Sequence, residues 1–282
     1  MQWFGRRQSS NVDDRRGISG GGLLAGGGVI GVIIYVAQLL LGGGDISDLQ
    51  QIIPGQQKEL TAEEKVADDQ RAEFVKVVLG DTEDVWDKLF AEQGNQYPKP
   101  TLVLFNGSTS SACGYASAAT GPFYCPSDQD VYIDLSFADD LKNRFGASGD
   151  FALAYVVAHE VGHHIQTLTG ASQKVQAIRQ RGDEREANRY SVMLELQADF
   201  YAGVWAHHNQ KMKNVILAND IPEALEAANA IGDDRLQQQG QGRVVPDAFT
   251  HGTSAQRMYW FKKGFETGDL RQGDTFSDPS LN

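Results

Sequence analysis

The stretch that most constrains this chain runs from Phe151 to Gly170 and reads FALAYVVAHEVGHHIQTLTG. His159 and His163 lie four residues apart, so on a helix both imidazoles face the same side. Glu160 directly follows the first histidine, where its carboxylate can reach a water on a metal ion without binding the ion itself. The surrounding residues are almost all apolar, which predicts a helix buried in a core. The HExxH pattern therefore predicts half of a zinc site on a rigid element.

A second helix is expected to supply the third metal ligand. In LELQADFYA, residues 194–202, Glu195 and Asp199 are four residues apart on a face that is otherwise apolar. A zinc ion with two histidines needs another protein ligand and an open position for water. We expect Glu195 to be that ligand, and Asp199 to accept the free ring N–H of His159 and so orient the ring. The alternative is that both carboxylates are ordinary solvated side chains.

An uncharged apolar run from Leu23 to Leu41 is long enough to cross a bilayer. Four arginines precede the run, and no lysine or arginine follows it until Lys58. The positive-inside rule then predicts a cytoplasmic N-terminus and an exported domain. A cleaved signal peptide is the alternative, but the run exceeds the usual apolar core of such peptides. Glycines with small-xxx-small spacing in the run suggest a homodimer through this anchor.

Beyond residue 60 the pattern is mostly helical. Thr61 and Glu64 form a capping box that opens a helix, which is expected to end at Gly80, with Asp81 capping a second helix. Short β-rich runs bounded by turn residues lie ahead of the HExxH helix. These runs are Thr101–Phe105, Phe123–Cys125 and Val131–Leu135.

The chain is acidic, with a formal net charge of -12, which argues against nucleic acid as a partner. Cys113 and Cys125 are the only cysteines. In an exported domain they would most simply form a disulfide. The alternative is two unrelated free thiols. Their spacing matches no zinc motif.

The chain resembles the bacterial neutral zinc metallopeptidase family in four runs: HEVGHHIQ, LELQADFYAGVWA, CGYASAATGPFYCPSDQDVYIDL and THGTSAQR. Members of that family join a short cytoplasmic N-terminus and one membrane anchor to an exported domain. More distantly, the chain is similar to the gluzincin metallopeptidases, in which HExxH and a downstream ExxxD supply two histidines, a glutamate and an outer aspartate. The resemblance implies Zn²⁺ as the cofactor. It also implies an α+β fold, a mostly helical zincin-like domain with a small antiparallel or mixed sheet, preceded by one transmembrane helix.

This resemblance and the patterns above divide the chain into five segments. We expect a cytoplasmic N-terminal segment (1–19), a transmembrane anchor (20–42), a linker (43–60), a zinc metallopeptidase domain (61–270) and a polar tail (271–282). The predicted location is the inner membrane of a bacterial cell, crossed once, with the catalytic domain in the periplasm.

The resemblance also suggests a second catalytic residue. His251 stands just before the last helix, and related membrane-bound gluzincins carry a His-Pro and a downstream arginine in a comparable place. Here Gly252 follows the histidine, and Arg257 would match the arginine. His251 is therefore a candidate to stabilise the developing oxyanion. The alternative is that both residues only shape the entry to the last helix.

In gluzincins the strand before the catalytic helix lies at the sheet edge and pairs with an extended substrate. By that resemblance, Gly114, Tyr115 and Ala116 would offer main-chain groups to a peptide. The alternative is a plain hairpin held by a cystine.

The predicted function is zinc-dependent hydrolysis of peptide bonds in a peptide or protein substrate, with Glu160 as the general base. One alternative is a zinc-binding envelope protein without catalytic activity, acting as an adaptor on the same scaffold. Another is a hydrolase of a different amide, such as a cell-wall peptide cross-link.

Overall fold

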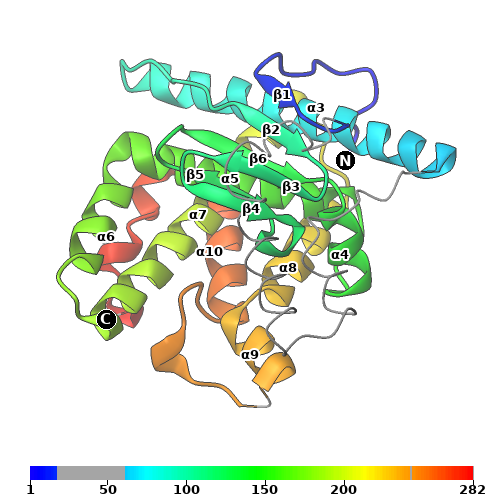
Figure 1. Cartoon of the computed structure of the whole chain (residues 1–282). Helices are drawn as coiled ribbons and strands as arrows, with labels where there is room; N and C mark the ends of the chain where they lie inside the picture. The colour runs from blue at the N-terminus through cyan, green and yellow to red at the C-terminus, as the bar shows by residue number, and fades with distance from the viewer. Residues whose placement is uncertain (18–60, 242, 282) are drawn as a thin grey trace, which may run out of the picture.

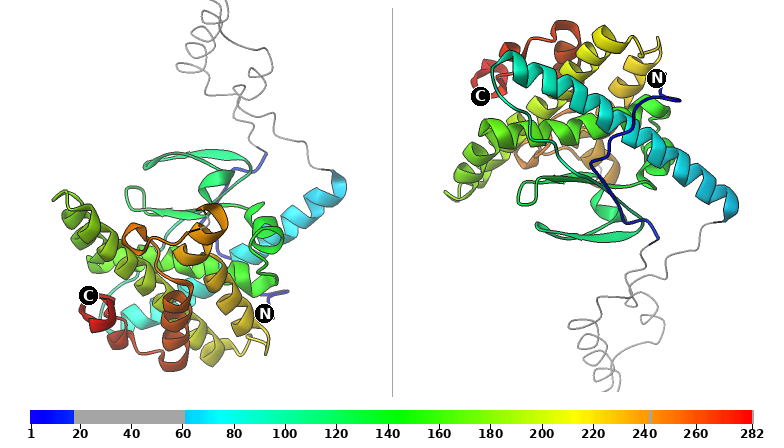
Figure 2. Two further views of the ribbon diagram at one scale, coloured as in Figure 1. Left: turned by 90° about the horizontal axis from the view of Figure 1, so that it is seen from below. Right: turned by 90° about the horizontal axis from the view of Figure 1, so that it is seen from above.

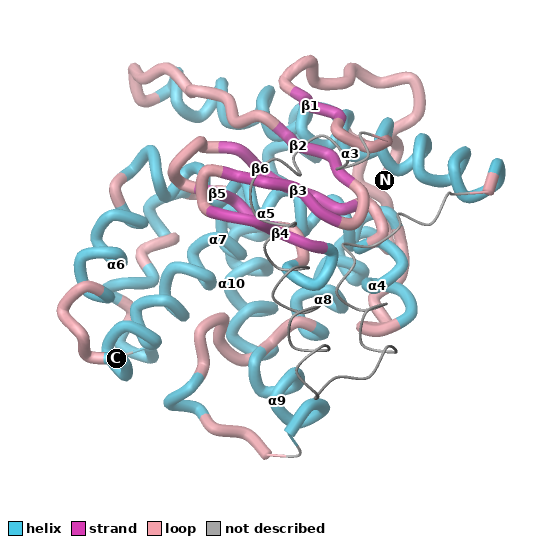
Figure 3. Tube along the Cα trace, viewed as in Figure 1, coloured by secondary structure: helices cyan, strands magenta, loops and turns pink. Residues whose placement is uncertain are grey.

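The computed structural model describes residues 1–17, 61–241 and 243–281. Its central element is α5 (Asp150–Thr169), which carries the HExxH pattern. All of residues 151–166 except His163 are buried, because α5 is apolar on nearly every side and other elements pack around it. Figure 1 and Figure 3 show the strands gathered on one side of this helix and most of the other helices on the opposite side.

The remaining helices enclose α5 or extend the layer around it. α3 (Ala62–Glu92), α7 (Glu184–Lys213) and α8 (Asp220–Ala230) contact α5 directly, and α10 (Ser254–Thr267) packs on α7 and α8. Three shorter helices complete the set in the described residues: α4 (Phe137–Asn143), α6 (Ala171–Arg179) and α9 (Asp233–Gln241). Short 3-10 turns lie at Ala118–Thr120, Pro246–Ala248, Leu270–Gln272, Thr275–Ser277 and Pro279–Leu281.

A small mixed sheet has the strand order β1-β2-β6-β5. β1, β2 and β6 run parallel, and β5 is antiparallel to β6 at the edge. A separate antiparallel hairpin, β3 with β4, stands beside it. The helical content and the mixed sheet agree with the α+β part of the predicted fold. The strands span Val12–Asp14 (β1), Leu102–Phe105 (β2), Ser108–Ser111 (β3), Gly114–Ser117 (β4), Phe123–Cys125 (β5) and Asp130–Asp134 (β6).

One continuous helix, α3, replaces the two helices expected on either side of Gly80, so that prediction is wrong. A Cβ at residue 80 would lie 3.1 Å from a backbone oxygen of the N-terminal segment, so the glycine allows that segment to approach the helix. Asp81 caps no helix. Its carboxylate accepts hydrogen bonds from Arg6 at 2.9 Å and from Lys213 at 2.8 Å. The two residues that suggested a helix boundary instead form a docking point within one helix.

The N-terminal segment, residues 1–17, runs along α3 and enters the sheet as β1 (Figure 2). Arg7 forms an ion pair with Glu83 at 3.0 Å, and Arg16 forms one with Asp68 at 2.7 Å. Both carboxylates belong to α3. The arginines that suggested a cytoplasmic flank are therefore ion-pair partners of the domain itself.

The predicted transmembrane anchor (20–42) and linker (43–60) lie outside the described residues. Among the residues that are described, no helix is both long and apolar enough to span a bilayer. A single crossing between residues 17 and 61 would put the N-terminal segment and the domain on opposite sides of a membrane, whereas the two pack together. The structure therefore contradicts the predicted single-pass inner-membrane location with a periplasmic domain, and the described residues give the predicted transmembrane helix no support. The homodimer expected through the anchor has no support in the described residues.

Two glycines allow α7 and α10 to cross in close contact. A Cβ added at Gly203 would lie 2.0 Å from a backbone oxygen of α10, and one added at Gly264 would lie 2.1 Å from a backbone oxygen of α7. No larger residue fits at either position. This crossing brings Arg257 on α10 to Asp199 on α7.

Candidate metal centre

The three expected metal ligands come from two helices that cross closely. Gly162 of α5 lies against Ala198 of α7, whose Cα would be 3.0 Å from a Cβ added at residue 162. The crossing brings His159 and His163 of α5 to Glu195 of α7. His159 Nε2 lies 3.2 Å from Glu195 Oε2, and His163 Nε2 lies 3.5 Å from Glu195 Oε1.

This donor set fits zinc. One ligand atom from each of His159, His163 and Glu195 lies within 4.8 Å of the other two. A tetrahedral zinc ion with bonds of about 2.1 Å holds its ligand atoms about 3.4 Å apart, close to the two separations between the histidines and Glu195. Two imidazoles and one carboxylate also form a ligand set of catalytic zinc sites, which keep a fourth position open.

Asp199 orients His159. Its carboxylate accepts a hydrogen bond from His159 Nδ1 at 2.8 Å, which leaves Nε2 facing Glu195. Arg257 donates to both oxygens of Asp199, from Nε at 2.8 Å and from the terminal nitrogen at 3.0 Å. The Tyr155 hydroxyl donates to the same carboxylate at 2.5 Å. The guanidinium of Arg257 is thus paired with Asp199. The role of Tyr155 was not predicted from the sequence, although Tyr155 lies one helical turn before His159.

Gln166 orients His163 in the same way, and this role was also not predicted from the sequence. Its side-chain oxygen accepts from His163 Nδ1 at 2.9 Å. Its amide nitrogen donates to the main-chain oxygen of Leu194 at 2.6 Å and to Gln197 at 3.2 Å. Gln166 is fully buried, so it ties α5 to the α7 residue that directly precedes Glu195. The signal was available, because Gln166 lies three residues after His163 on the same helix.

The charges around the site favour a cation between the two helices. Burial opposes a proton on His159, but Asp199 and Glu195 outweigh it and raise the pKa of the imidazole to about 10. Burial likewise opposes ionisation of Asp199, yet the Arg257 guanidinium and His159 lower its pKa to about 2. The pKa of Glu195 is also lowered, because the two imidazoles outweigh its burial. Both carboxylates are therefore ionised at neutral pH.

A cavity of about 1000 Å³ opens over the site and is lined by the three expected ligands together with Glu160 and His251. Glu160 is 8% exposed, and its carboxylate has no hydrogen bond or ion pair to another described residue. The side chain of His251 is half exposed, and its Nδ1 lies 3.2 Å from Asp233 Oδ1. That hydrogen bond, opposed by burial, raises the pKa of His251. The structure thus brings both expected catalytic residues to one cavity.

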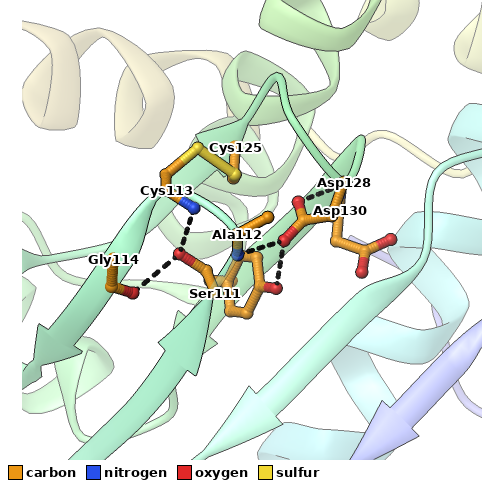
Figure 4. Close-up of a disulfide and its surroundings, with 8 residues drawn as sticks. Ser111, Ala112, Cys113, Gly114, Cys125, Asp128 and Asp130 are labelled. Carbon is orange, nitrogen blue, oxygen red and sulfur yellow. Dashed lines mark hydrogen bonds between the residues drawn. A yellow bond between two sulfur atoms is a disulfide. The ribbon is translucent and has the colours of Figure 1, made fainter.

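The expected substrate strand lies elsewhere. Residues 114–116 belong to β4, which pairs with β3, and none of them lines the cavity. Tyr115 is 72% exposed. The predicted disulfide between Cys113 and Cys125 is present and ties this hairpin to β5 (Figure 4). It is β5 that reaches the cavity, through Phe123 and Tyr124. The hairpin therefore supports the edge strand instead of lining the cavity.

Comparison with known proteins relates this site to a family. A family model described as "Putative neutral zinc metallopeptidase" matches residues 1–276. The chain is 50% identical over 284 residues to the uncharacterized protein YpfJ of Escherichia coli (strain K12), covering 98% of this chain and 99% of the relative. It is 44% identical over 216 residues to the uncharacterized protein Rv2575 of Mycobacterium tuberculosis (strain ATCC 25618 / H37Rv), covering 73% of this chain and 71% of the relative. No solved structure matches the chain.

Proposed function

We propose that this chain, which belongs to the neutral zinc metallopeptidase family, hydrolyses peptide bonds at the site formed by His159, His163 and Glu195. Zinc is the metal of this family, and peptides or proteins are the substrates of peptidases. The observation that carries the proposal is the convergence of the three donor groups within 4.8 Å, with the carboxylate of Glu160 facing the same cavity. A purely structural zinc site would fill its fourth position with a protein ligand.

The chain's own residues divide the work of hydrolysis. His159, His163 and Glu195 would hold zinc, which would supply a Lewis acid for the scissile carbonyl and for the attacking water molecule. Glu160 accepts a proton from the attacking water and passes it to the departing amine. Asp199 and Gln166 keep the two imidazoles in the tautomer whose Nε2 faces the metal position.

His251 is the proposed donor to the oxyanion. Its Nδ1 stays with Asp233, so Nε2 is left to donate to the carbonyl oxygen as negative charge develops there. Arg257 supports the reaction indirectly, because both of its contacts with Asp199 keep His159 in place. The substrate main chain lies along β5, the antiparallel edge strand that lines the cavity, and the hairpin containing Gly114, Tyr115 and Ala116 braces that strand through the disulfide.

The test is hydrolysis of a denatured, reduced and carboxymethylated protein by the zinc-loaded full chain. We expect Glu160→Gln to retain zinc and to lose about 10² to 10⁴-fold in kcat/KM, the usual contribution of a general base. Glu186→Gln, at a partly buried position on α7 outside the cavity, is the matched control and should keep full activity.

Two results would contradict the proposal. If wild type and Glu160→Gln both bind zinc and neither cleaves the substrate, the chain is better described as a zinc-binding adaptor. If both cleave equally, Glu160 is not the general base. Peptidoglycan fragments in the same assay distinguish a hydrolase of cell-wall peptide cross-links from a general peptidase.

A further inference from the structure

The cavity over the metal site differs in character at its two ends. Its lining follows α5, with α4 beside the N-terminal end of that helix and α6 at the C-terminal end (Figure 1). On α5, Val156, Glu160 and His163 share one face, so Val156 lies one turn from the proposed general base. The two directions away from the reacting bond therefore meet different surfaces.

The end beside α4 is apolar. The rings of Phe137, in α4, and Phe145, just after it, have centroids 6.2 Å apart, and both residues line the cavity together with Val156. Ile231 and Leu236, from the end of α8 and from α9, line the same cavity. Both phenylalanines and both aliphatic residues are only partly buried, so they leave apolar surface available to a ligand. We call Phe137, Phe145, Val156, Ile231 and Leu236 the apolar chamber.

The end beside α6 is polar but uncharged over most of its lining. Gln173, Gln176 and Gln180 line it together with Ser172. Arg179 is the one cation there among the described lining residues, and it is already engaged, because its Nε and terminal nitrogen both donate to Ser191. This end offers amide and hydroxyl groups that suit a peptide main chain or neutral side chains.

The described lining of the cavity offers no uncommitted carboxylate to a basic side chain or to a substrate ammonium. Glu160 and Glu195 are the only carboxylates among its described lining residues, and both are committed to the proposed chemistry. Its other arginine, Arg257, is 2% exposed and paired with Asp199. An aminopeptidase needs a further anion for the substrate ammonium, and a carboxypeptidase needs a free cation for the terminal carboxylate. No such anion is present in the described lining, and Arg179, the one accessible arginine, lies at the polar end and donates to Ser191.

We infer that the substrate is an internal stretch of polypeptide whose large apolar residue, at the cleaved bond, enters the apolar chamber. This inference rests on the proposed peptidase function and specifies its substrate class. Burial of an aromatic or leucine side chain against the chamber removes apolar surface of both partners from water. A lysine or aspartate side chain there would lose its hydration without gaining a counter-ion. The reaction is then an endopeptidase cleavage next to an apolar residue.

The test uses binding, so that it does not depend on turnover. The zinc-loaded, full-length Glu160→Gln chain is titrated with fluorescent peptides that are acetylated and amidated at their ends. Their glycine-serine background carries one variable residue: phenylalanine, leucine, serine, lysine or aspartate. We expect the phenylalanine and leucine peptides to bind about ten-fold or more tightly than the other three. We also expect free-ended versions to bind no more tightly than the blocked ones.

Chamber variants give the control. Phe137→Ala, made in the same background, should lower the preference for phenylalanine over serine about ten-fold. Gln173→Ala, at the polar end, should leave that preference unchanged. Leu236→Ala is a second chamber variant in case Phe137→Ala fails to retain zinc, and it should lower the preference in the same direction.

The inference is overturned by equal binding of all five peptides, by tighter binding of the lysine or aspartate peptide, by no binding of the phenylalanine peptide at millimolar concentration, or by a requirement for a free terminus. Its failure differs from failure of the proposed function. If the wild type cleaves peptides without an apolar preference, the role of the apolar chamber is refuted and the peptidase function stands. If the peptides bind with an apolar preference but the wild type cleaves none of them, the peptidase function is refuted and the apolar chamber stands as a binding site.

Discussion

Asp199 is the residue on which the charge balance of the metal site depends. Fully buried, it accepts from His159, Tyr155 and Arg257. Its negative charge increases the basicity of the His159 ring and fixes its orientation. Asp199→Asn keeps the shape and removes that charge, so we expect zinc affinity to fall about 10 to 100-fold. Competition with a chelator of known zinc affinity measures the change.

Gln197→Glu tests whether any charge change near this part of α7 has the same effect. Gln197 forms hydrogen bonds with Gln166 and with the main-chain oxygen of Gly273, and with neither histidine. We expect its effect on zinc affinity to be clearly smaller than that of Asp199→Asn. An Asp199→Asn protein with unchanged zinc affinity would show that this carboxylate does not tune the metal.

At the scale of residues, the sequence predicted the metal donors because spacing on a helix determines which side chains share a face. His159 with His163, and Glu195 with Asp199, needed only a helix for their directions to be known. The partner of Arg257 was not predictable in this way. It depends on how α10 crosses α7, which no local spacing encodes.

The crossing of α7 and α10 is the element-level feature that holds the network together. Gly264→Ala would place a methyl group 2.1 Å from the backbone of α7, so the helices must separate and Arg257 must withdraw from Asp199. We expect a loss of about 3 kcal/mol or more in the free energy of unfolding, at the upper end for overpacking. Urea denaturation of the metal-free chain measures it.

Two comparisons make that result specific. Tyr259→Ala, on the exposed side of α10, should change the free energy of unfolding by less than about 1 kcal/mol. Gly162→Ala, where the nearest atom would be 3.0 Å away, should cost less than Gly264→Ala. An unchanged stability of Gly264→Ala would mean that α7 and α10 are farther apart than described.

Helices and strands were predictable where local signals and tertiary packing agree. The capping box of Thr61 and Glu64 opens α3 as expected. Gly80 and Asp81 led to the wrong prediction of a helix boundary. In the sequence, a glycine that allows another segment to pack closely on a helix cannot be distinguished from one that ends the helix. The β-rich runs were found, but the choice of β5 over β4 as the strand at the cavity required knowledge of which strand forms the sheet edge.

At the scale of the whole molecule, the N-terminal segment is part of the domain, and ion pairs fasten it. Hydrogen bonds from Arg16, against burial, lower the pKa of Asp14 to about 2, and the pKa of Asp199 is also about 2. Both values lie below the unfolded value near 3.9. Their stabilisation is therefore complete above about pH 5 and is lost progressively as the pH falls toward 2. We expect the urea midpoint of the metal-free chain to fall between pH 5 and pH 3.

Asp14→Asn provides the check on that assignment. It should lower stability at pH 6 and make the decline between pH 5 and pH 3 shallower, because one of the titrating groups is gone. A urea midpoint that stays constant over this range in the wild-type chain would contradict the role given to these carboxylates.

The membrane prediction failed at this same scale. Arginines followed by an apolar run have the composition of a membrane flank, and composition alone does not show which carboxylates the arginines meet. In the folded chain, Arg7 and Arg16 meet Glu83 and Asp68 on α3. The partners in these ion pairs are more than fifty residues apart in the sequence, so rules based on neighbouring residues cannot predict them.

The most direct test of this account is the zinc content of the full chain before and after Glu195→Ala, with Glu186→Ala on the same helix as the matched control. Metal is measured by mass spectrometry of the purified proteins after dialysis. The account predicts one zinc ion per chain in the wild type and in Glu186→Ala, and little or none in Glu195→Ala, because two histidines alone hold zinc weakly. A full complement of zinc in Glu195→Ala would contradict the site described here.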